Sequence, residues 1–169
     1  MPNPILRGFG HLTQFRGRDT RSQFWPYAGV ATALYLVVGW AVLIPVTLPI
    51  IGGSTPVSEV EFSRAISRFM LISFLMFAGL VALLAAAVVR RLHDSGRSGL
   101  WGLLPLPFAS FSCVVFQRLF VQFGSGAPDM GLFFSAFVSN VFYMVGLVTL
   151  IVFLSLRSSE TPNKYGDLP

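Results

Sequence analysis

The residue types that could do chemistry are concentrated in one polar segment, residues 90–99. There His93 stands next to Asp94, and a carboxylate that orients an imidazole is the arrangement used by general bases and around metal ions. Neighbouring residues of a helix point about 100° apart, so we expect Asp94 to pair with an arginine rather than with His93. Arg91 lies three residues before Asp94 and shares a helix face with it. We therefore predict no catalytic residue here and leave His93 to donate a hydrogen bond or to sense pH.

Several other kinds of site lack the residues that they need. The chain has two histidines and one cysteine, which alone are too few ligands for a zinc site. The sequence contains no glycine-rich phosphate loop and no Gly-x-Ser-x-Gly motif. No Asp, Glu, His, Lys or Arg residue lies in the middle of an apolar run, where coupled transporters place such titratable groups. We accordingly expect no metal, no cofactor and a non-enzymatic protein.

Two further polar segments accompany the central one. Residues 15–25 precede the first apolar run and carry Arg18 and Arg21, which share a face if the segment is helical. The alternative for this segment is a membrane anchor, with arginines at lipid phosphates and the adjacent tryptophan in the headgroup layer. Residues 162–169 are rich in Asn, Gly and Pro, which predicts a turn-rich, non-helical tail. In that tail, Tyr165 is a candidate for docking against neighbouring loops.

The elements that must position these segments follow from composition. Of the 169 residues, 54% are hydrophobic and 11% charged, whereas soluble domains carry about 25% charged residues. A soluble protein of this size would expose apolar patches that aggregate. Crossing the hydrocarbon takes about 20 apolar residues, and the chain has four apolar runs, at residues 26–51, 69–89, 100–116 and 132–156. We predict an all-α integral membrane protein with four transmembrane helices, forming one membrane domain over residues 1–169.

Local signals predict where some of these helices begin and end. Residues 58–61 read as a capping box, so the second helix is expected to begin well before its apolar run. Gly96 is placed to end that helix in a left-handed conformation, and Ser98 to cap the next one. Pro105 and Pro107 interrupt the third apolar run, which predicts a kink or a tilted span there.

The basic residues predict the orientation. An even number of spans puts both termini on one side, and that side carries nine of the twelve Lys and Arg residues. The positive-inside rule then places both termini in the cytoplasm. Because the arginines flank apolar runs in short loops, the net charge of +5 does not indicate a nucleic-acid partner.

The three polar segments together resemble the bacterial inner-membrane family catalogued as domain of unknown function 805. Its opening pattern Gly-Arg-x-x-Arg-x-x-Phe-Trp matches residues 17–25, its signature Arg-Arg-Leu-His-Asp-x-Gly-Arg-Ser-Gly matches residues 90–99, and its closing Asn-x-Tyr-Gly-x-x-Pro matches residues 163–169. The chain departs from the pattern at Leu100, where the family often has Trp, and at Asp167, where Pro is usual. The resemblance implies four spans in the bacterial inner (cytoplasmic) membrane, and no established activity.

We therefore expect an arginine-rich cytoplasmic surface that binds an anionic lipid headgroup, a phosphate ligand or an acidic partner. The candidate ligand-binding residues are Arg18, Arg21, Arg90, Arg91, His93, Asp94, Arg97, Asn163 and Tyr165. Two alternatives stay open: an accessory subunit of a larger membrane complex, and a lipid- or isoprenoid-phosphate enzyme or small transporter. Membrane lipids are the expected partners, and a membrane-protein partner or a second copy of the chain would be additional ones.

Overall fold

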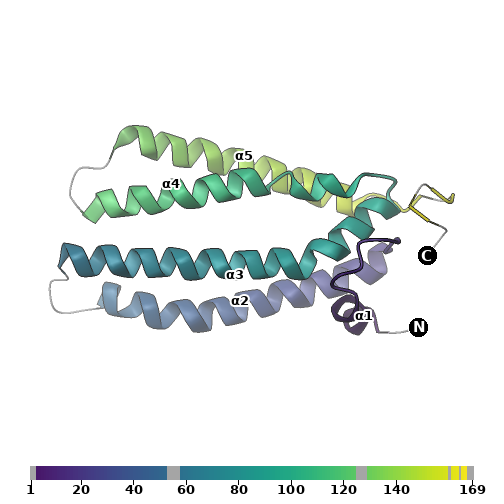
Figure 1. Ribbon diagram of the computed structural model, residues 1–169, viewed down its shortest axis with the longest axis horizontal. Coiled ribbons are helices and arrows are strands. Elements are labelled where there is room, and N and C mark those ends of the chain that lie inside the picture. The colour runs from purple at the N-terminus through teal and green to yellow at the C-terminus, as the bar shows by residue number, and fades with distance from the viewer. Residues whose placement is uncertain (1–2, 53–57, 125–128, 160, 164, 167–169) are drawn as a thin grey trace. The chain divides into compact units, whose positions relative to one another are not determined.

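The computed structural model describes residues 3–52, 58–124, 129–159, 161–163 and 165–166. They form five α-helices and a short 3-10 helix, η1 (Figure 1). In chain order these are α1 (Pro4–Gly10), α2 (Arg21–Gly52), α3 (Glu59–Asp94), η1 (Gly99–Leu103), α4 (Leu106–Gly124) and α5 (Met130–Ser155). Within the described residues, four helical stretches are long and apolar enough to cross a membrane: Arg21–Pro45, Val60–Asp94, Gly99–Gln122 and Met130–Ser155. The expectation of an all-helical chain with four such helices is confirmed.

The ends of α3 follow the local sequence signals. At its start, the Ser58 Oγ accepts from the Glu61 N–H at 3.3 Å, and the Ser58 N–H donates to the Glu61 Oε2 at 3.2 Å. This is the predicted capping box. At its end, Gly96 has a φ of +76°. The Gly96 N–H donates to the His93 carbonyl and the Arg97 N–H to the Leu92 carbonyl, the two bonds of a Schellman motif.

The third apolar run is broken into two helices. The Ser98 Oγ accepts from the Leu100 N–H at 3.3 Å, so the predicted cap is present but begins η1 rather than an α-helix. Pro105 lies between η1 and α4, since it has no N–H to continue the helical bonding. A Cβ on Gly146 would lie 3.3 Å from the Pro105 Cα, so the glycine lets α5 approach closely at this break.

The chain divides into two compact units. The first, which we call the polar unit, comprises Met1–Leu34, Gly79–Pro105 and Met144–Pro169. The second, the apolar unit, comprises Tyr35–Ala78 and Leu106–Tyr143.

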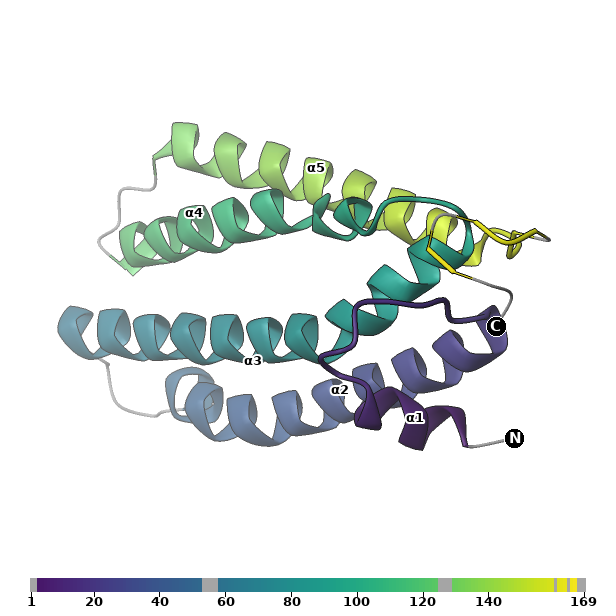
Figure 2. The ribbon, with the colours of Figure 1, turned by 45° about the vertical axis from the view of Figure 1, so that its right-hand side comes forward.

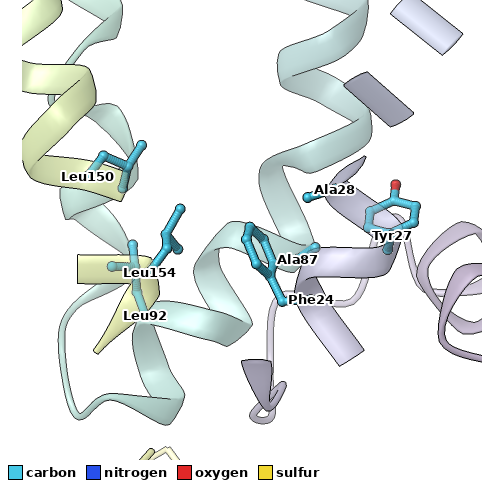
Figure 3. Packing of buried hydrophobic residues seen from close by; sticks show 7 residues of the cluster. All are labelled: Phe24, Tyr27, Ala28, Ala87, Leu92, Leu150 and Leu154. Carbon is cyan, nitrogen blue, oxygen red and sulfur yellow. The ribbon is translucent and has the colours of Figure 1, made fainter. Parts of the chain in front are cut away.

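The polar unit has a hydrophobic core built from three helices. Figure 3 shows its buried residues: Phe24, Tyr27 and Ala28 of α2, Ala87 and Leu92 of α3, and Leu150 and Leu154 of α5. The Tyr27 hydroxyl donates to the Leu83 carbonyl at 2.6 Å, which satisfies the one polar atom of that ring. Figure 2 shows α1 beside the first turns of α2. Gly8 permits this approach, because a Cβ there would lie 2.2 Å from the Tyr27 ring.

Within the apolar unit, α4 and α5 pack against each other. Val115 and Leu119 of α4 pack with Ala136 of α5, and the buried Ser112 and Ser139 hydroxyls are hydrogen-bonded at 2.8 Å. Large side chains elsewhere on the long helices face outward. Val37, Leu71, Phe111 and Phe137 are 68%, 58%, 55% and 61% exposed. The outer surface of these helices is therefore apolar.

Candidate functional site

Asp94, the last residue of α3, is the centre of a buried polar network in the polar unit. Its side chain is fully buried. One carboxylate oxygen, Oδ1, forms an ion pair with Arg18 at 3.1 Å, and the other, Oδ2, forms one with Arg91. The Oδ2 also accepts from the Ser158 hydroxyl at 2.5 Å. A single carboxylate thus joins the segment before α2, the end of α3 and the segment after α5.

Arg91 completes the C-terminus of α5. Its Nε donates to the Leu154 carbonyl at 2.8 Å, and its Nη2 donates to the Leu156 carbonyl. The Arg21 Nη1 donates to the Ser155 carbonyl at 3.4 Å. The last turn of α5 has no basic residue of its own, while its final carbonyls have no partners within the helix. The guanidinium groups of α2 and α3 supply both the donors and the positive charge that favours a helix C-terminus.

Arg18 fastens the C-terminal tail to the network. Its Nη2 donates to the Ser159 carbonyl at 2.8 Å, and its Nη1 donates to the carbonyls of Thr161 and Gly166 at 3.3 and 3.5 Å. The tail returns a bond of its own, because the Ser159 N–H donates to the Asp94 carbonyl at 2.9 Å. The Arg18 side chain is 1% exposed. Five planar donors in a fixed fork suit this task, since they can reach several carbonyls at once.

Asp19 and Arg90 form a second buried pair beside the first. The Arg90 Nε donates to the Asp19 Oδ2 at 2.7 Å, and the Asp19 N–H donates to the Arg90 carbonyl at 3.3 Å. The Arg90 Nη1 donates to the carbonyls of His11 and Gln14. Arg7 of α1 approaches the other carboxylate oxygen of Asp19 at 3.2 Å. This pair fixes α1 and the following loop to the end of α3.

His93 is the point where the tail docks on α3. Its ring lies parallel to the Tyr165 ring, with the ring centroids 3.8 Å apart and an angle of 6° between the planes. The Asn163 Nδ2 donates to the His93 carbonyl at 3.0 Å. The tail itself closes as a turn, with paired backbone bonds between Asn163 and Gly166. The three polar segments of the sequence therefore meet in one place.

All nine residues that the sequence singled out lie in the polar unit, but in different roles. Asp94 pairs with arginines and not with His93, as expected. Arg18, Arg90 and Arg91 are 4%, 4% and 0% exposed, and their donors engage carboxylates and backbone carbonyls of the chain itself. Of the nine residues, Arg21 is exposed. Arg97 is half-buried, and its guanidinium carbon lies 4.5 Å from the centroid of the Phe153 ring.

Several members of the network were not foreseen from the sequence. Asp19 follows Arg18 directly, and two adjacent residues of opposite charge are a signal that could have marked Asp19 as a member of the ion-pair network. Ser158 and Ser159 come right after an uncapped helix, where hydroxyls commonly bind backbone or carboxylate groups. Arg7 gave no local signal, because its partner Asp19 is twelve residues away and across a loop.

The arrangement offers little to a metal ion. Among the described residues, no group of three or more His, Cys, Asp or Glu side chains is placed to hold one. The two buried carboxylates are already engaged by guanidinium groups. The network is therefore an internal clamp between segments that are far apart in sequence.

One comparison with known proteins finds a match over most of the chain. A protein-family model, described as a protein of unknown function (DUF805), matches residues 12–167, which include the first two polar segments and all but the last two residues of the third. Comparisons with curated proteins and with solved structures found no match. The chain thus belongs to the DUF805 family.

Proposed function

We propose that the chain is a non-enzymatic multi-pass protein of the bacterial inner membrane, with both termini in the cytoplasm, and that the polar unit binds anionic lipid headgroups. The helices have the length and the outward-facing apolar surface that a bilayer requires. The excess of basic residues beside the termini supports the orientation.

The observation that carries the proposal is a division of the arginines into two layers. Among its described residues, the polar unit has eight arginines and two aspartates. Both aspartates are buried and paired with buried arginines, Asp94 with Arg18 and Arg91 and Asp19 with Arg90. These three arginines form the inner layer. The outer layer, Arg16, Arg21 and Arg157, is exposed. The inner layer holds the fold, and the outer layer presents guanidinium groups suited to phosphate, one of which, Arg21, also donates to the Ser155 carbonyl.

Two tryptophans support a headgroup ligand over a soluble one. Trp25 at the start of α2 and Trp101 of η1 are 40% and 44% exposed, and both belong to the polar unit. Exposed indole rings are typical of the interface between hydrocarbon and headgroups. Arginines at the same level would meet phosphates of the cytoplasmic leaflet, where each contributes about 1 kcal/mol.

Lipid selectivity tests the proposal. The protein is purified in nanodiscs containing equal amounts of phosphatidylglycerol and phosphatidylcholine, and the bound lipids are counted by native mass spectrometry. The triple variant Arg16→Gln, Arg21→Gln, Arg157→Gln should lose selectivity for phosphatidylglycerol, by up to on the order of a hundredfold at low salt. Unchanged selectivity in this variant would refute headgroup binding by the outer layer.

The chain supplies a matched control. Arg64 and Arg68 of α3 and Arg118 of α4 are also exposed arginines, but they belong to the apolar unit. Replacing all three with Gln should leave the selectivity unchanged, and an equal loss would mean that net charge alone matters.

Orientation is tested in spheroplasts with Cys113→Ser chains. An impermeant maleimide should label Arg64→Cys but not Arg157→Cys, and the reverse result would contradict cytoplasmic termini.

A further inference from the structure

Asn140 is a polar residue in an apolar part of α5. It is the eleventh of 26 residues in the helix, about 15 Å from Met130 and about 22 Å from Ser155 along the axis. Its side chain is exposed. Within the part of the chain that the structure describes, no hydrogen bond to its amide is present. The short side chain cannot reach either interface from this depth.

Three hydroxyl side chains of α5, by contrast, are hydrogen-bonded within the chain. The Ser135 hydroxyl donates to the Gly131 carbonyl at 2.7 Å, and the Thr149 hydroxyl donates to the Val145 carbonyl at 2.8 Å. The Ser139 hydroxyl donates to the Ala136 carbonyl at 3.0 Å and also bonds Ser112. These three hydroxyls are satisfied inside the chain, whereas the Asn140 amide is not satisfied by any residue that the structure describes.

Asn140 continues an exposed apolar face of the helix. Phe133 and Phe137 precede it at spacings of four and three residues, and they are 44% and 61% exposed. This alternation of four and three is the spacing of a helix–helix seam, in which a single Asn fixes the register of identical chains. The packing of α5 on α4 uses different residues, Ala136 and Ser139, which are 2% and 4% exposed. The seam is therefore left open in one copy of the chain.

We propose that a second copy of this chain docks on the face formed by Phe133, Phe137 and Asn140, with the two Asn140 amides hydrogen-bonded to each other. An amide carries both donors and an acceptor, so it is complementary to itself across a two-fold axis. Two copies inserted in the same orientation place their Asn140 residues at the same depth. In hydrocarbon, which offers no hydrogen-bond partner, this pairing satisfies both amides.

The inference rests on the proposed membrane insertion of α5 but not on headgroup binding. It is therefore tested in neutral phosphatidylcholine vesicles, after alkaline carbonate extraction has shown that the protein is membrane-embedded. Release by carbonate would refute insertion, and with it both proposals. A loss of phosphatidylglycerol selectivity in the arginine variant would leave the dimer prediction untouched.

Association is measured by energy transfer between labelled copies at decreasing protein-to-lipid ratios. Asn140→Leu should weaken the dimer by about three- to twentyfold, the range found for polar contacts between membrane helices. Asn140→Gln keeps the amide and should associate more tightly than Asn140→Leu. Ser135→Ala, on another face of α5, is the matched control and should behave as wild type. A wild-type chain that stays monomeric, or an Asn140→Leu chain of unchanged affinity, would overturn the proposal.

A crosslinking pair keeps the test independent of how Asn140 variants fold. In a Cys113→Ser background, Phe137→Cys lies on the proposed seam, and Val138→Cys lies about 160° from Asn140 around the helix. Val138 is 48% exposed, so the two cysteines are comparably accessible. Mild oxidation should crosslink Phe137→Cys into a dimer in preference to Val138→Cys. Equal yields would place the contact elsewhere and exclude this seam.

Discussion

Replacing Asp94 with asparagine tests whether the polar network holds the ends of the helices together. The substitution preserves the size of the side chain but removes its charge, and it places an amide group where a carboxylate oxygen now faces a guanidinium group. Both carboxylate oxygens are engaged, with Arg18 on one and with Arg91 and Ser158 on the other. The variant therefore leaves two arginines without their shared carboxylate.

The expected cost follows from burial. The Asp94, Arg18 and Arg91 side chains are 0%, 1% and 0% exposed, so the surface value of about 0–1 kcal/mol for an ion pair does not apply. Removing one partner of a buried pair costs about 3–5 kcal/mol, because the remaining charge stays out of water. We expect Asp94→Asn to lower the free energy of unfolding by about this amount.

The assay is equilibrium unfolding in mixed micelles, with helix content followed by circular dichroism. Hydrogen exchange of residues 158–163 adds a local measurement, since the Ser159 N–H is bonded to the Asp94 carbonyl. Asp129→Asn is the matched control. Asp129 is exposed and accepts from the Gly131 N–H at 2.7 Å just before α5, where Asn caps about as well as Asp. The reasoning is wrong if Asp94→Asn costs less than about 1 kcal/mol, or no more than this control.

Two further substitutions test single contacts of the polar unit. Gly8→Ala would place a Cβ 2.2 Å from the Tyr27 ring, and we expect overpacking to lower the free energy of unfolding by about 1–3 kcal/mol in the same assay. Gly10→Ala, where the space is open, should cost little. Equal effects of the two substitutions would contradict this packing. Tyr165→Leu removes the ring stacked on His93, and such a ring pair contributes about 0.5–1.5 kcal/mol. Limited proteolysis of the tail should therefore become about two- to tenfold faster. Tyr165→Phe keeps the ring and should be cleaved at a rate closer to that of wild type.

Much of the fold was predictable because it depends on local patterns. Four apolar runs of sufficient length predicted four long helices. The capping box at Ser58 and the left-handed glycine at Gly96 are determined by residues within one or two turns. The early start of α3 was predicted from the same capping box: the helix begins at Glu59, ten residues before its apolar run, because helical bonding continues through Arg64 and Arg68 without needing an apolar environment.

The candidate site was predictable in part of its membership but not in its arrangement. The motif residues marked Arg18, Arg90, Arg91 and Asp94, and helix spacing alone paired Arg91 with Asp94. No pattern showed that Arg18 would hold a tail more than 140 residues away. Sequence reasoning therefore predicted arginines that face an external anion, whereas three of them face the chain's own carbonyls.

The sequence by itself determined that this chain is helical, that four of its helices can span a membrane, and that its basic groups gather beside three polar segments. These properties depend on hydrophobicity and on neighbours within a few residues. Only the tertiary structure decided which arginines are buried and which are exposed. Burial depends on which segments meet, and here the end of α3 meets both the loop before α2 and the tail after α5. The same meeting gives the uncapped carbonyls of α5 their donors, so what looked like one basic surface is an inner clamp with an outer layer of exposed charge.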